Sequence, residues 1–202
     1  MNPLNSVKGS IVTAFVLAII ISLALTLGAD APASFNIHQV GRWLHIVAGV
    51  MWIGLLYYFN VVQTPGLADA AADKGGPGGA GVSKYIAPRA LWWFRWAAVL
   101  TWVTGAYYLL FGFGSTDVLH KAFAFQPGFR TIGVGAWLGT IMLLNVWGLI
   151  WPNQKKILGM KPATDEEKAK ARRVALLASR VNFVLSVPML MCMAGQSHGL
   201  PF

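Results

Sequence analysis

The chain has 202 residues, of which 56% are hydrophobic and only 11% are charged, whereas about 25% of the residues in an average soluble domain are charged. So few charges could not cover the surface of a water-soluble protein of this size, so the composition excludes the soluble and disordered classes. The net charge of +9 would suggest nucleic-acid binding in a soluble protein. Here the basic residues lie between long apolar runs, which indicates a lipid bilayer as the partner and no nucleic acid.

Five apolar runs are each close to the roughly 20 residues that a membrane-spanning helix needs. We therefore expect an all-α integral membrane bundle that forms a single domain over residues 1–202, with spans near residues 11–28, 40–62, 91–113, 132–151 and 174–196. The first run has an apolar core longer than that of a secretion signal, so we interpret it as a retained span. The glycine-rich stretch Gly75–Gly81 predicts a loop between the second and third spans.

The distribution of lysine and arginine predicts the orientation of these spans. Thirteen of these residues lie before the first span, in the second and fourth connections or at the near end of the fifth span, and three (Arg42, Lys121 and Arg130) lie on the opposite side. Because cytoplasmic loops carry the excess of positive charge, we expect a cytoplasmic N-terminus and a periplasmic C-terminus. The predicted location is the bacterial inner membrane, crossed several times.

With this topology all four histidines (His38, His45, His120 and His198) fall near the periplasmic face. Imidazole is a ligand for haem iron, copper and zinc, so the pattern favours a metal-containing cofactor there. His45 is the strongest candidate ligand and His198 the second, while His38 and His120 are weaker. We expect b-type haem, with copper as the alternative.

His45 lies about two turns into the second span, where an unpaired imidazole would be poorly solvated. Gly49, four residues later on the same helical face, removes side-chain bulk and could leave a gap for a porphyrin plane. The alternative is an imidazole bonded to a carbonyl or hydroxyl of a neighbouring helix, with Gly49 serving close helix packing. Trp52, one turn further on, is expected to line the same pocket.

Arg180 is the most unusual polar residue of the fifth span, because a guanidinium at membrane depth needs a partner or access to water. We interpret it either as a ligand for an anion, such as a haem propionate or an acidic substrate, or as a side chain that reaches the interface. No aspartate or glutamate lies within any span, which excludes a carboxylate proton relay.

Several blocks of this sequence, in order, are similar to one known family. They are Arg42–Gly54, Phe94-Arg95-Trp96, Gly139–Trp147, Ile150–Lys156 and Leu185–Pro188. Together they resemble the membrane domain of the bacterial cytochrome-c-linked urate oxidases, also called urate hydroxylases. The resemblance covers roughly residues 40–198. At one position the chain departs from the pattern: Val181 stands beside Asn182 where the resemblance leads us to expect a histidine.

The resemblance implies a membrane oxidoreductase that passes electrons to a c-type cytochrome. Because Cys192 is the single cysteine, the sequence has no C-x-x-C-H haem attachment motif, so the expected partner is a separate cytochrome c or another membrane subunit. The alternative is a cofactor-free accessory subunit of a larger respiratory or photosynthetic complex. A transporter is disfavoured because the spans lack acidic residues and paired half-repeats.

Overall fold

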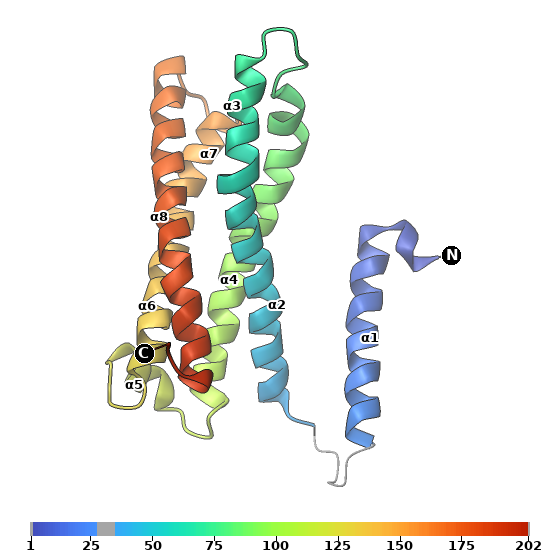
Figure 1. Cartoon of the computed structure of the whole chain (residues 1–202), viewed down its shortest axis with the longest axis vertical. Coiled ribbons are helices and arrows are strands. Elements are labelled where there is room, and N and C mark those ends of the chain that lie inside the picture. Colours follow the sequence, from blue (N-terminus) through green and yellow to red (C-terminus); the bar gives the residue numbers. More distant parts are fainter. Residues whose placement is uncertain (1, 28–34, 202) are drawn as a thin grey trace. The chain divides into compact units, whose positions relative to one another are not determined.

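The computed structural model describes residues 2–27 and 35–201, and all the regular structure in these residues is helical (Figure 1). Two compact units divide at Ile37. The first consists of a short 3₁₀ turn, Pro3–Asn5, followed by α1, Val7–Leu27, which is apolar on every side. Gly28, the last residue of the first predicted span, lies outside the described residues. The expectation of a single domain over the whole chain remains a prediction.

The second unit is a bundle of four long helical rods, which Figure 1 shows side by side. The rods and their connections are α2 (Ile37–Tyr57) continuing into α3 (Thr64–Ala72), α4 (Ala87–Phe111), the short α5 (Val118–Phe123), α6 (Arg130–Asn145) continuing into α7 (Trp151–Ile157), and α8 (Asp165–His198). Between α3 and α4, residues 73–79 are not helical, as the glycine-rich sequence predicts.

Four helical segments are long and apolar enough to cross a membrane: Val7–Thr26, Ile37–Ala72, Arg130–Ile157 and Asp165–His198. This result confirms a helical chain with several candidate spans. The third predicted span corresponds to α4, whose 25 residues would extend about 37 Å at the rise of an α-helix. This helix is less apolar than the other four segments because it contains Arg95 and several tryptophans and tyrosines. The count of five spans and the orientation therefore remain predictions.

The rods α2–α3 and α6–α7 extend beyond the second and fourth predicted spans. A proline follows the end of each of these spans, and the helical rod continues through it. Three wide π-helical turns occur at Tyr58–Gln63, Val82–Ile86 and Val146–Ile150, and Pro65, Pro88 and Pro152 follow them at the first or second position of the next helix. A proline has no N–H and its ring clashes with the carbonyl four residues earlier. That carbonyl lies inside the π turn in each case, so the backbone widens there and the helix continues.

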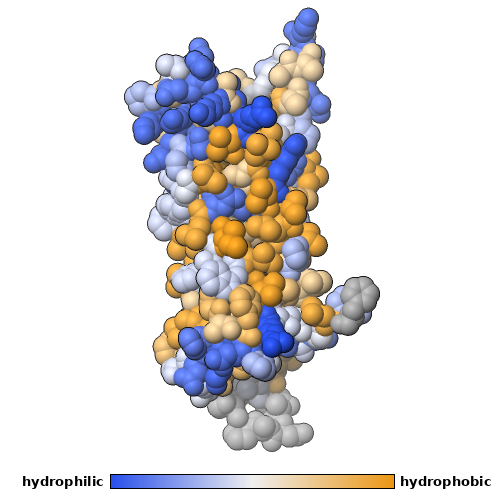
Figure 2. Space-filling model, turned by 90° about the vertical axis from the view of Figure 1, so that its left-hand side faces the viewer, coloured by the Kyte–Doolittle hydropathy of each residue, from blue (hydrophilic) through white to orange (hydrophobic). Residues whose placement is uncertain are grey.

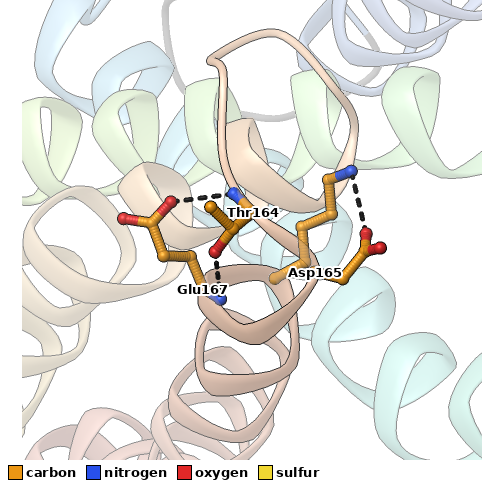
Figure 3. Close-up of polar contacts among 4 residues, drawn as sticks. Thr164, Asp165 and Glu167 are labelled. Carbon is orange, nitrogen blue, oxygen red and sulfur yellow. Dashed lines mark hydrogen bonds and ion pairs between the residues drawn. The ribbon is translucent and has the colours of Figure 1, made fainter.

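The start of α8 shows why the polar segment before the fifth predicted span is helical (Figure 3). The side chain of Thr164 accepts a hydrogen bond from the backbone N–H of Glu167 at 3.2 Å, and the Glu167 carboxylate accepts one from the Thr164 backbone at 2.9 Å. This reciprocal capping box satisfies two amides that a helix start leaves unpaired. The helix therefore begins at Asp165, nine residues before the apolar run that the sequence marks as a span.

Close packing of α6 against α8 uses one of the two glycines in the G-x-x-x-G sequence Gly135-Ala136-Trp137-Leu138-Gly139. A Cβ atom added to Gly135 would lie 3.2 Å from Cβ of Cys192 on α8, whereas a Cβ on Gly139 would have no atom within 4 Å. Small residues at such a contact allow two backbones to approach. Gly135 therefore sets the α6–α8 distance, and Gly139 leaves local space.

The core of the bundle takes residues from all four rods: Trp52, Ile53 and Leu56 of α2, Phe94, Ala97 and Ala98 of α4, Met142, Val146 and Ile150 of α6 and the π turn after it, and Ala178 and Met189 of α8. On the face that Figure 2 shows, apolar side chains form a band, and hydrophilic residues gather at both of its ends. This distribution is the one that a bilayer with two polar interfaces favours.

Candidate cofactor site

The histidines gather at one end of the bundle, as the sequence predicts. His38 and His45 are in the first half of α2, His120 is in α5, and His198 ends α8. Figure 1 shows the start of α2, α5 and the end of α8 at the same end of the second unit. His120 and His198 are exposed, whereas the Nδ1 atom of His38 lies 3.1 Å from the hydroxyl of Tyr107 on α4.

His45 is held between α2 and α4 by a single short hydrogen bond. Its Nδ1 atom lies 2.7 Å from the backbone oxygen of Thr101. A carbonyl can only accept, so Nδ1 carries the proton and donates it. In the neutral ring the other nitrogen, Nε2, then has its lone pair free. Within the described part of the chain Nε2 has no hydrogen-bond partner, so this geometry leaves one nitrogen able to bind a metal.

The glycine that makes room for the His45 ring is Gly105 on α4, not Gly49. A Cβ atom at Gly105 would lie 2.8 Å from Cε1 and 2.9 Å from Nδ1 of His45, which is closer than real Cβ contacts. A Cβ at Gly49 would lie at an ordinary 3.7 Å from Cγ2 of Thr101. Thr101 of α4 therefore lies over Gly49 at a distance that an added methyl group would tolerate, and a role of Gly49 beside a cofactor stays a prediction.

Trp52 lies in the core with only 2% of its surface exposed, on the same side of α2 as the other buried residues of that helix. Its indole Nε1–H is buried and has no hydrogen-bond partner among the described residues. Buried polar groups are nearly always paired, so this donor is available to a group or a water that the protein binds. The role of Trp52 in lining a pocket remains a prediction.

Arg180 and His198 do not belong to one site. Both are exposed residues of α8, and they are 18 positions apart, which is about 27 Å along a straight helix. Arg180 has no ion pair within the described residues, and it lies away from the end where the histidines gather. The structure does not bring Arg180 close to the histidines, and the roles of Arg180 and His198 as ligands stay predictions.

A second feature of the interior is a series of hydrogen bonds that joins α8 to α2 and α6. Nδ2 of Asn145 donates to Oδ1 of Asn182 at 2.7 Å, and Nδ2 of Asn182 donates to the carbonyl of Met142 at 3.0 Å. The Ser186 hydroxyl donates to the Phe183 carbonyl, so the Tyr57 hydroxyl, 3.0 Å away, must donate to Ser186. Asn182 and Ser186 are completely buried.

Another link to α8 comes from the π turn Tyr58–Gln63, which follows α2. Nδ2 of Asn60 donates both to the Leu56 carbonyl and to the Ser179 hydroxyl on α8, each at 2.8 Å. The sequence indicates these polar residues but not their pairing, because Tyr57 and Asn60 are more than 100 positions from Ser186 and Ser179. Periodicity within one helix carries no information about which neighbouring helix supplies the partner.

Comparison with known families finds one match. The family model for the urate oxidase N-terminal region matches residues 111–202. These residues, less than half of the chain, are similar to that family. The match confirms the resemblance that the sequence blocks suggest and covers the segment from the end of α4 to the end of α8, including Asn145, Asn182 and Ser186. No curated protein and no solved structure shows significant similarity to the chain.

The His45 imidazole has the features that a haem ligand would need. Haem brings four nitrogen ligands of its own, so one positioned imidazole is enough to hold its iron, whereas copper and zinc sites take most of their ligands from the protein. His45 is such an imidazole, because the Thr101 carbonyl fixes its ring and its tautomer. No group of three or more His, Cys, Asp or Glu side chains that could hold a metal occurs among the described residues.

Proposed function

We propose that this urate-oxidase-related chain is a membrane redox protein that binds b-type haem through Nε2 of His45. The observation that carries the proposal is the hydrogen bond from Nδ1 of His45 to the carbonyl of Thr101, 2.7 Å long. Metal-ligating histidines nearly always donate their other ring N–H to a carbonyl, carboxylate or water, and this bond raises the basicity of the ligating nitrogen. The family relationship of residues 111–202 supports a urate-hydroxylase-like setting.

In this proposal two residues of α4, Thr101 and Gly105, position the His45 imidazole. The Thr101 carbonyl holds the imidazole in one tautomer, and Gly105 lets the ring lie directly against α4. The bundle around the ring is apolar, so it keeps water from the ligating nitrogen. Bound haem supplies a one-electron carrier, and the partner is a separate cytochrome c at the periplasmic face of the inner membrane.

The experiment that tests the proposal is a reduced-minus-oxidised absorbance spectrum of the protein purified in detergent from a haem-replete membrane. We expect a b-type α band and about one haem per chain by the pyridine haemochrome assay. A colourless preparation that copurifies in fixed ratio with a larger complex would refute the redox assignment and favour an accessory subunit instead.

A matched pair of glycine variants tests whether the His45–Thr101 geometry matters. In Gly105→Ala the new Cβ would come within 2.8 Å of the imidazole, so the ring must move and its bond to Thr101 must lengthen. Loss of such an orienting bond typically weakens metal-centre binding about 10- to 100-fold, which haem titration of the apoprotein measures. In the control, Gly139→Ala, the added methyl meets no atom within 4 Å. We expect that variant to bind haem normally, and equal affinities for the two variants would contradict the assigned role of the bond.

A further inference from the structure

The opposite end of the bundle contains an arginine with an unusual environment. The guanidinium of Arg95, in the third turn of α4, lies 3.9 Å above the ring centre of Trp151 on α7. A planar guanidinium at this distance from an indole gains cation–π attraction. Its N–H groups, which lie in the plane of the fork, remain available for other acceptors. Arg95 is half-buried, and it makes no hydrogen bond or ion pair with any other described residue.

A second positive group lies near the Trp151 ring. The ammonium of Lys155, also half-buried, lies 5.7 Å from the centre of the Trp151 ring. Trp151 therefore contacts two positive groups from two different elements, α4 and α7. Like charges near one ring repel each other, and a negative group close to both would relieve this repulsion.

Three acidic residues at this end of the bundle have partners elsewhere. Asp165 is 3.5 Å from the ammonium of Lys168, Glu167 accepts the amide of Thr164, and Asp73 accepts the amide of Gly75. No carboxylate of the described residues, Asp69 and Glu166 included, forms an ion pair with Arg95 or Lys155. The protein thus leaves the two cations at Trp151 unneutralised by any ion pair within its described residues, which points to an anion supplied from outside.

The surroundings of Arg95 indicate where that anion comes from. The first two turns of α4 form a shallow, mainly apolar hollow of ≈ 310 Å³, lined by Pro88, Arg89, Trp92 and Trp93. Both tryptophans are more than 40% exposed, and exposed tryptophans are typical of the level of the lipid headgroups. At that level the abundant anion is the phosphate of a phospholipid, which the arginine fork binds through two parallel hydrogen bonds.

We propose that Arg95, Trp151 and Lys155 form a binding site for the phosphate of an anionic phospholipid headgroup. Arg95 donates to the phosphate through its fork, Lys155 adds a second charge, and Trp151 holds both cations in place. The acyl chains run from there along the apolar surface of the bundle toward the middle of the bilayer. Basic pockets between membrane helices bind anionic headgroups in this way. The site is independent of the histidines and of haem.

The test is lipid retention by the purified full-length protein, measured by native mass spectrometry in detergent with added phosphatidylglycerol or phosphatidylcholine. The measurement is made at about 0.3 M salt, where the Debye length falls to about 6 Å and diffuse attraction is screened. We expect one phosphatidylglycerol to be retained at least about tenfold more tightly than phosphatidylcholine, since phosphatidylcholine has the same phosphate but also a choline cation, which Arg95 and Lys155 repel. Equal retention of the two lipids would overturn the proposal.

Two variants and a control locate the site. Arg95→Gln should lower phosphatidylglycerol affinity about tenfold, and Arg95→Lys, which keeps the charge but loses the fork, should lower it by a smaller factor. The control is Lys156→Gln, which removes one charge from the residue beside Lys155 but none from the Trp151 ring. Equal losses for Arg95→Gln and Lys156→Gln would show that only diffuse charge matters. If Arg95→Gln does not fold, Arg95→Lys is used in its place. Wild-type affinity for phosphatidylglycerol in Arg95→Lys would refute binding of the phosphate by the guanidinium fork.

A separate arm distinguishes the lipid from a free anion. Inorganic phosphate at millimolar concentration is added to the protein in phosphatidylcholine nanodiscs, and its binding is followed through the fluorescence of the tryptophans and by phosphate titration. We expect no saturable binding, because a free phosphate lacks the acyl chains that anchor a lipid in the bilayer beside the two cations. Saturable binding of inorganic phosphate that Arg95→Gln abolishes would overturn the assignment to a lipid.

Discussion

Replacing His45 with alanine is expected to remove the b-type α band from the purified protein. The substitution deletes Nε2, the proposed ligand atom. It also removes the imidazole ring, whose orientation is fixed by the hydrogen bond from Nδ1 to the carbonyl of Thr101 at 2.7 Å. Loss of an orienting partner alone typically weakens a metal centre about 10- to 100-fold, so loss of the ligand itself should have at least this effect. The measurement is haem content per chain, together with the reduced-minus-oxidised spectrum.

The control for this result is His120→Ala. His120 is exposed on α5 at the same end of the bundle, so its removal deletes an imidazole without disturbing the α2–α4 contact. We expect wild-type haem content in this variant. His198→Ala is informative in a different way, because a change in spin state with retained haem would identify His198 as a second axial ligand. A normal α band in His45→Ala would refute the proposed site.

The sequence alone predicts the helical architecture well because apolar run length is a direct consequence of bilayer thickness. Each predicted span coincides with an observed helix, and the capping residues Thr164 and Glu167 account for the long polar start of α8. The helices extend beyond two of the predicted spans: the second and fourth spans stop at residues 62 and 151, whereas the helical rods continue to Ala72 and Ile157. A helical rod can continue through a proline when the turn before the proline widens into a π turn. A hydropathy pattern does not predict such a turn.

The candidate site is less predictable from sequence because it depends on which helices face each other. Within α2 the spacing of His45 and Gly49 suggests a gap, but the partner helix decides whether the gap is open. In the structure Thr101 covers Gly49, and Gly105, 60 positions from His45, lies against the imidazole. Glycine in the third span is a signal that sequence reasoning could have used, since a helix that packs against a ring needs a residue without a side chain at the contact.

Replacing Asn182 with alanine is expected to be among the most destabilising single changes in the bundle. Asn182 is 0% exposed, and its side chain accepts from Asn145 at 2.7 Å and donates to the carbonyl of Met142 at 3.0 Å. Hydrogen bonds between membrane helices contribute about 0.6 kcal/mol each on average, and the cavity and the polar groups left without partners add to the loss. We expect the free energy of unfolding to fall by about 2 kcal/mol, measured by steric trapping in bicelles.

Asn153→Ala is the matched control, because the Asn153 side chain is not buried and bonds only to the Leu149 carbonyl of its own rod. Its expected effect is within about 0.5 kcal/mol. The two single variants and the double variant of Asn145 and Asn182 together form a double-mutant cycle, which measures the coupling energy between the two side chains. A coupling energy of about 0.6–1.7 kcal/mol is expected for a hydrogen bond between membrane helices. Additive single effects would mean that the Asn145–Asn182 bond makes no measurable contribution in the bilayer.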